Sequence, residues 1–103
     1  MKTLRLISFN TRSFTASDGS SSVESISERL SVLRPDVLCL NEVNLSQQPN
    51  ALTDLTRSLS ASTGLNYKFD FFGHFGGVYG NAILSAHTMS NARHIKLDGG
   101  TIV

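Results

Sequence analysis

Little in the sequence points to disulfides, to a membrane span or to a strong electrostatic field. Cys39 is the single cysteine among 103 residues, which excludes an internal disulfide and a zinc site built from several cysteines. The formal net charge is only +1, so no global positive field draws the chain to nucleic acid or to an anionic lipid surface. The longest apolar runs fall far short of the roughly 20 residues that cross a bilayer.

The first residues begin like a signal peptide but do not continue as one. Arg5 interrupts the apolar stretch that starts at Leu4, and Asn10 and Arg12 stand where small residues would mark a cleavage site. The sequence therefore predicts no signal peptide and an intracellular protein.

The composition is that of one small folded domain. Apolar residues make up 40% and charged residues 17% of the chain, as in globular proteins. A length of 103 residues leaves room for a single domain and one hydrophobic core.

The apolar pattern predicts strands and helices in alternation. Strands are expected over residues 4–9, 37–40, 67–72 and 78–85, with a further one over 93–97. Helices are expected from about residue 22 to the residues before Pro35, and over residues 50–62 before Gly64. A strand–helix–strand order implies a right-handed crossover between parallel strands, which is an α/β arrangement.

Two local patterns give finer predictions. Ser21 and Glu24 have the spacing of a capping box, and Pro49 can occupy the first turn of the second helix. The run over residues 37–40 lacks polar alternation, which is typical of a strand buried on both faces. Cys39 lies in that run and is therefore expected to be an inert core residue.

Polar residues follow the first two predicted strands. Asn10 comes directly after the first strand, and Glu42 comes just after the second. Parallel strands place their carboxyl ends at one edge of the sheet, where α/β proteins bind ligands. A carboxylate and a carboxamide oxygen are hard ligands of the kind that Mg²⁺ uses. Alone, Glu42 would more often be a solvated loop carboxylate and Asn10 a turn or cap residue.

Three segments carry a resemblance to a known family. They are Leu4-Arg5-Leu6-Ile7-Ser8-Phe9-Asn10, then Arg34-Pro35-Asp36-Val37-Leu38-Cys39-Leu40-Asn41-Glu42-Val43, then Tyr79-Gly80-Asn81-Ala82-Ile83-Leu84-Ser85. In this order and spacing they resemble the endonuclease/exonuclease/phosphatase superfamily, the DNase I-like and exonuclease III-like phosphoesterases. The similarity spans residues 4–85.

The resemblance implies a fold, a cofactor and a reaction. The fold would be the N-terminal half of a four-layer αββα sandwich, with one mixed sheet and two helices. Asn10 and Glu42 would be the catalytic and metal-binding residues, holding Mg²⁺ or, as an alternative, Mn²⁺. The substrate would be a phosphoester, with nucleic acid, phospholipid and small phosphoesters all left open. Bound metal would stabilise charge on the phosphoryl group.

The sequence also departs from the family pattern. Asn41 stands where the family usually has glutamine, and Ala86-His87-Thr88 replaces the usual arginine and proline. The Asp-x-Asn motif and the Asp-His pair of the family's second half are absent from the sequence. We therefore expect residues 1–103 to form a partial domain, active only once completed by a second half or by self-association. The alternatives are a non-catalytic half-domain that acts by binding, and a gene fragment without function.

Other polar residues have plainer interpretations. Asn81 can orient a group at the catalytic edge or make a structural hydrogen bond, and Tyr79 is expected to pack half-buried. Arg12 and its loop could approach a phosphate at the same edge or simply be solvated. Three histidines lack metal-site spacing and are expected on the surface or in turns: His74, His87 and His94.

Overall fold

The chain alternates strands and helices, as its hydrophobic pattern predicts. The computed structural model describes residues 3–46, 48–74 and 77–88. Its elements are β1 (Leu6–Asn10), the short 3₁₀ helix η1 (Arg12–Phe14), α1 (Val23–Leu33), β2 (Val37–Asn44), α2 (Ala51–Thr63), β3 (Lys68–Gly73) and β4 (Tyr79–Ser85). The further strand expected over residues 93–97 lies outside the described residues.

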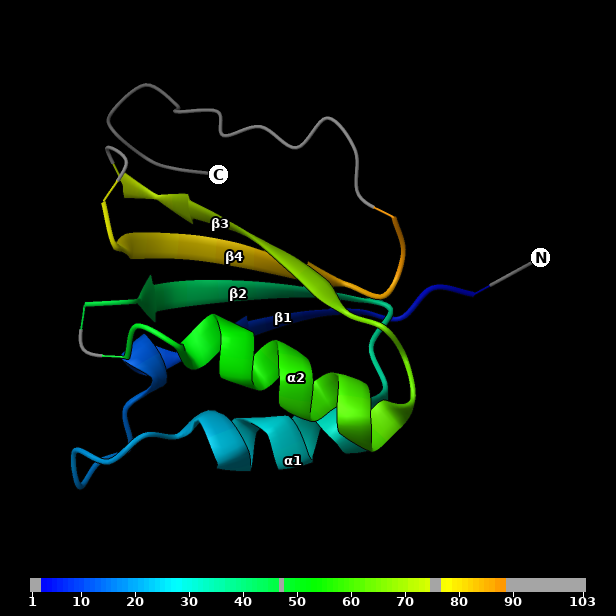
Figure 1. Ribbon diagram of the computed structural model, residues 1–103, viewed down its shortest axis with the longest axis horizontal. Helices are drawn as coiled ribbons and strands as arrows, with labels where there is room; N and C mark the ends of the chain where they lie inside the picture. Colours follow the sequence, from blue (N-terminus) through cyan, green and yellow to red (C-terminus); the bar gives the residue numbers. More distant parts are fainter. Residues whose placement is uncertain (1–2, 47, 75–76, 89–103) are drawn as a thin grey trace.

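The strands form one mixed sheet in the order β1-β2-β4-β3. β1 and β2 pair in parallel, and β4 is antiparallel to both β2 and β3. It follows that β1, β2 and β3 run in the same direction. Their carboxyl ends lie at one end of the sheet, on the left of Figure 1, together with the start of β4.

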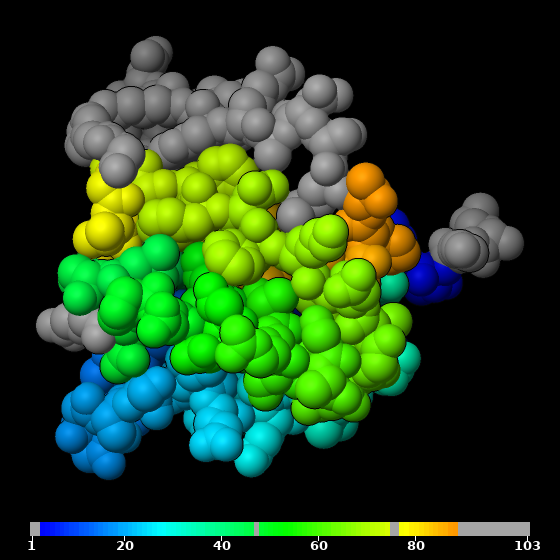
Figure 2. Space-filling view, in the orientation of Figure 1, coloured from blue at the N-terminus to red at the C-terminus, as the bar shows by residue number. Residues whose placement is uncertain are grey.

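Both helices cover the same face of this sheet. The connections β1–α1–β2 and β2–α2–β3 each step across the sheet in the same direction, and right-handed crossovers then put both helices on one side. In the space-filling view, α2 lies across the middle of the molecule, with α1 on one side of it and β3 on the other (Figure 2).

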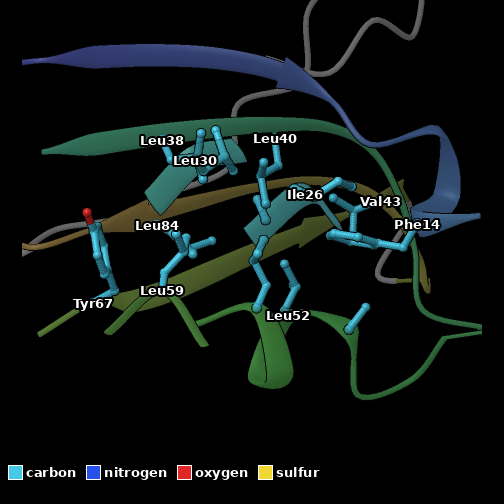
Figure 3. Packing of buried hydrophobic residues seen from close by; sticks show 13 residues of the cluster. Phe14, Ile26, Leu30, Leu38, Leu40, Val43, Leu52, Leu59, Tyr67 and Leu84 are labelled. Atoms are coloured by element: carbon cyan, nitrogen blue, oxygen red, sulfur yellow. The ribbon is translucent and has the colours of Figure 1, made fainter. Parts of the chain in front are cut away.

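The hydrophobic core lies between the helices and that face. Its buried members are Phe14, Ile26, Leu30, Leu38, Leu40, Val43, Ala51, Leu52, Leu55, Leu59, Tyr67, Ala82 and Leu84. Figure 3 shows Phe14 beside Val43 near η1, while Tyr67 closes the opposite end of the cluster. The Tyr67 hydroxyl donates a hydrogen bond to the Pro35 carbonyl oxygen, which satisfies its buried polar group. None of the described helices is long and apolar enough to cross a membrane.

The opposite face of the sheet is not covered by the described residues, which corrects one prediction. In β2, Leu38 and Leu40 are buried, whereas Val37 and Cys39 alternate with them and are only partly buried. Leu6, which pairs with Val37, remains 68% exposed. The strand at residues 37–40 is therefore fully buried on one face alone, and Cys39 is a free thiol on the open face rather than a core residue.

The helix ends differ in detail from the predicted caps. The N-cap of α1 is Ser22 rather than Ser21, and its side chain makes no capping hydrogen bond. The Ser21 hydroxyl oxygen instead accepts from the Val23 amide at 3.3 Å. Pro49 stands before the N-cap of α2, outside the first turn. Gly64 ends α2 in the left-handed conformation, with φ of 77°, as expected for a helix-terminating glycine.

Candidate active site at the carboxyl ends of β1 and β2

The parallel pairing of β1 and β2 brings Asn10 and Glu42 together. Asn10 is the last residue of β1 and pairs with Asn41 in register. The Asn10 side-chain amide donates a short hydrogen bond from Nδ2 to Oε2 of Glu42. Both residues are exposed, so the paired groups face solvent at the edge of the sheet. The two residues singled out from the sequence therefore form one polar site.

A β-bulge aims Glu42 into this site. The ladder between β2 and β4 shifts after Leu40–Ala82 and resumes at Val43–Gly80, so Asn41 and Glu42 together oppose one residue of β4. Glu42 has a φ of 55°, a left-handed conformation that non-glycine residues seldom adopt. Bulges re-aim side chains next to functional sites, and backbone strain concentrates at such sites.

Buried Thr11 holds the bulge from the end of β1. Its amide donates to the Asn41 carbonyl oxygen at 3.0 Å. Its hydroxyl lies 3.1 Å from the same oxygen and 2.8 Å from the Glu42 carbonyl oxygen. The next amide, that of Arg12, donates to Asn10 Oδ1 at 2.9 Å. The backbone after β1 thus fixes both members of the pair, a role for Thr11 that no sequence motif indicates.

A comparison with known protein families decides how to interpret this pair. The sequence profile of the Endonuclease/Exonuclease/phosphatase family matches residues 7–101. The chain belongs to this family. A search of curated proteins and a search of solved structures each found no significant match. Membership of this family indicates a phosphoesterase-type domain. The mixed sheet and two helices described above are consistent with it.

Further residues of this family domain lie near the same edge. Asn81 is the residue of β4 between Gly80 and Ala82, so it lies opposite the bulge of β2, and on its other side it pairs with Phe72 of β3. Its side chain is partly buried. Tyr79 is 42% exposed, less enclosed than expected, and its ring centroid lies 6.0 Å from that of His74. His74 lies in the turn after β3, as expected, since its carbonyl accepts from the Gly77 amide at 2.8 Å.

A second polar cluster occupies the opposite end of the sheet. His87 Nε2 lies 3.0 Å from Asp36 Oδ1, and the Arg5 amide donates to Asp36 Oδ2 at 2.7 Å. These contacts, first the Arg5 amide and then His87, lower the pKa of Asp36. Glu42 lies six positions after Asp36 along β2 and the residue before it, which corresponds to about 20 Å of extended chain. This His–Asp pair is therefore too distant to act on a group held at Glu42. The sequence does not indicate the pair, because the two residues are 51 positions apart in the chain.

The donor set at the carboxyl edge is small. Across residues 3–46, 48–74 and 77–88, no cluster of three or more His, Cys, Asp or Glu side chains could enclose a metal ion. The Asn10–Glu42 pair offers one carboxylate and one carboxamide instead. Such a pair suits a cation that keeps several waters and binds substrate oxygens directly, and it does not suit a closed structural metal site.

Proposed function

We propose that this domain is a metal-dependent phosphoesterase in which Glu42 and Asn10 hold Mg²⁺, with Mn²⁺ as an alternative. The observation that carries the proposal is the hydrogen-bonded Asn10–Glu42 pair at the carboxyl ends of two parallel strands. The same geometry in an unrelated α/β chain would suggest only a polar edge. In a member of the Endonuclease/Exonuclease/phosphatase family, it favours the site of phosphoester hydrolysis.

The chemistry of the two side chains fits a divalent cation. Glu42 is exposed, and its Oε1 atom accepts no hydrogen bond from the described residues. Asn10 Oδ1 accepts a single hydrogen bond, from Arg12, and a carboxamide oxygen has a second lone pair. Water and phosphate oxygens would supply the remaining ligands that Mg²⁺ requires. When bound, the cation would stabilise negative charge developing on the phosphoryl group and leaving group.

The protein's own contribution is to hold these groups in place before substrate arrives. Thr11 fixes the backbone on which Glu42 stands, and the Asn10 amide holds the carboxylate in one orientation. Preorganised donors and acceptors need no rearrangement as the reaction proceeds, which is the main electrostatic advantage of an active site. Asn10 thus has two roles in this proposal, as a ligand through its oxygen and as a positioning residue through its nitrogen.

We further propose that hydrolysis requires a second layer on the open face of the sheet. That face presents Leu6 at 68% exposure and the partly buried side chains of Cys39 and Ile83. The one His–Asp ion pair among the described residues, His87–Asp36, lies at the opposite end of the sheet and cannot serve as the base that activates water at the carboxyl edge. A second half, from the same polypeptide or another, would cover the apolar face and supply that base.

A non-catalytic role is the second candidate. The open apolar face favours it, because exposed hydrophobic surface of this kind marks interaction sites as well as unfinished cores. In that case the domain would act by binding a partner or itself. Concentration-dependent association of a chain that is indifferent to Mg²⁺ and lacks hydrolytic activity would favour this candidate.

The test is hydrolysis of bis(p-nitrophenyl) phosphate by the protein as its source produces it, with Mg²⁺ or with EDTA. The control for Glu42→Gln is Glu28→Gln, the same change at an exposed position of α1. We expect Glu42→Gln to lower kcat by about a hundredfold, as for loss of one preorganised electrostatic group, and Glu28→Gln to leave it unchanged. Equal rates and equal Mg²⁺ dependence in all three proteins would contradict the proposal.

A further inference from the structure

The chain turns in a left-handed sense directly after the candidate active site. Arg12, Ser13 and Phe14 have φ values of 51°, 60° and 54° in succession. Residues other than glycine avoid this region, because Cβ comes too close to the following carbonyl oxygen, and they visit it singly rather than in runs. Such conformations persist only where the surrounding structure imposes them. The fold must therefore supply contacts that hold this turn.

The turn is held between two fixed points. The Thr11 hydroxyl is bound to the bulge through the Glu42 carbonyl oxygen at 2.8 Å. Phe14, three residues later, is fully buried. Its amide donates to the Thr11 carbonyl oxygen at 2.9 Å, which closes the turn. Arg12 and Ser13 lie between these points, so neither can relax to a negative φ unless Thr11 or Phe14 moves.

Phe14 is the anchor at the second point. It is the one fully buried apolar side chain in the described loop of residues 11–22. Its ring lies beside Val43, which follows Glu42 in β2 (Figure 3). Its carbonyl oxygen accepts from the Ser22 amide at 2.9 Å. Burial of an aromatic ring is among the largest apolar contributions that one residue makes, so it can offset the conformational cost of the turn.

Closure of the turn matters to the site because of the Arg12 amide. This amide donates to Asn10 Oδ1 at 2.9 Å, and it belongs to the peptide group that joins Thr11 to Arg12. If the Phe14 ring left the core, the strained turn would open and this peptide group could rotate. The orientation of the Asn10 carboxamide therefore depends on a residue four positions away.

We infer that Phe14 is a positioning residue of the candidate metal site. It holds Asn10 through the left-handed turn, and it supports the bulge at Glu42 through Val43. Because its ring is fully buried, it acts through these neighbours and not on metal or substrate. The inference rests on the proposed function, since it concerns the same two metal-binding groups.

Metal affinity tests this role apart from turnover. Mn²⁺ is titrated into the protein as its source produces it, and the free ion is measured by its electron paramagnetic resonance signal. The variants are Phe14→Leu and Leu59→Ala, a core change on α2 toward the Tyr67 end of the cluster (Figure 3). We expect Phe14→Leu to raise the Kd for Mn²⁺ about tenfold, as for loss of a group that orients a metal ligand, and Leu59→Ala to leave it unchanged. Wild-type affinity in Phe14→Leu, or an equal loss in both variants, would overturn the inference.

Glycine at position 13 separates strain from packing. Glycine adopts a positive φ without steric cost, but it fills no space in the core. Ser13→Gly added to Phe14→Leu should therefore regain about threefold of the lost Mn²⁺ affinity. Ser17→Gly added to Phe14→Leu, at an exposed loop position outside the left-handed turn, should regain none. A Phe14 ring that only filled space would give equal affinities in the two double variants, and that result would contradict the inference.

Two measurements in EDTA keep the inference separate from the proposed function. In a chain with an intact core, Ser13→Gly should raise the urea midpoint of unfolding and Ser17→Gly should lower it; a lower midpoint in both would overturn the strain argument. Hydrogen exchange of the Arg12 amide should accelerate about tenfold in Phe14→Leu and stay unchanged in Leu59→Ala, and equal rates in all three proteins would also overturn it. If these metal-free results hold while the wild type binds no Mn²⁺, the proposed function fails and the positioning of Asn10 by Phe14 stands.

Discussion

Glu42 has a backbone conformation that disfavours its own side chain, so replacing it by glycine should leave the stability of the fold nearly unchanged or slightly higher. Its φ of 55° lies in the left-handed region, which costs a non-glycine residue about 1–2 kcal/mol. Glycine removes that cost but returns about 0.5–1 kcal/mol through the greater freedom of the unfolded chain. The exposed hydrogen bond from Asn10 is also lost, at about 0.5 kcal/mol. The free energy of unfolding of Glu42→Gly should therefore lie between about 0.5 kcal/mol below and about 1 kcal/mol above that of the wild type.

Asn41→Gly is the matched control for that substitution. Asn41 is exposed in the same bulge and is not among the described non-glycine residues with positive φ. Glycine there brings only the entropic cost, so this variant should lose about 0.5–1 kcal/mol. Urea unfolding in EDTA measures both variants. Equal destabilisation by the two substitutions would refute the argument that the fold accepts strain at Glu42 to aim its carboxylate.

Three further predictions concern the scaffold. Leu55→Ala, at a fully buried core position, should lower the free energy of unfolding by about 2–5 kcal/mol in urea. Gly80→Ala should prevent native pairing of β3 and β4, because the added Cβ would meet the Phe72 carbonyl oxygen at 2.0 Å, and loss of the cooperative unfolding transition would report it. The Arg5 amide, and after it His87, lowers the pKa of Asp36. Its ionised form therefore stabilises the fold at pH values above the ordinary carboxyl pKa of 3.8, and this contribution is lost as the pH falls through the pKa of the folded state. Asp36→Asn should accordingly reduce stability at pH 7 and weaken the pH dependence below about pH 4, as followed by urea unfolding at each pH; an unchanged acid limb would contradict this.

The sequence predicts the order of the elements well because the physics that sets it is local. The helical spacing of the leucines shows where the two helices lie. Pro35 marks the end of the first helix and Gly64 the end of the second, within a few residues. The parallel pairing of the first two strands follows from the crossover rule, and that pairing is what brings Asn10 and Glu42 together.

What the sequence does not reveal depends on the tertiary arrangement. The exposure of Cys39 is set by which face of the sheet the helices cover, and a four-residue apolar run contains no information about that choice. The bulge at Glu42 depends on a register shift against β4, and the support from Thr11 depends on that bulge. The proximity of Asp36 and His87 arises from strand pairing across 51 positions of the chain. These features need the folded structure to be seen.

The central claim is that Glu42 and Asn10 form the metal site, and substoichiometric Mn²⁺ tests it most directly. In the ¹⁵N-labelled protein, paramagnetic broadening should be strongest at the amides of Asn10, Glu42 and Asn81, which lie at one edge of the sheet. The amides of Asp36 and His87, about 20 Å away, should stay sharp, and Glu42→Gln should abolish the effect. Broadening centred on Asp36 and His87, or broadening that survives Glu42→Gln, would contradict the account.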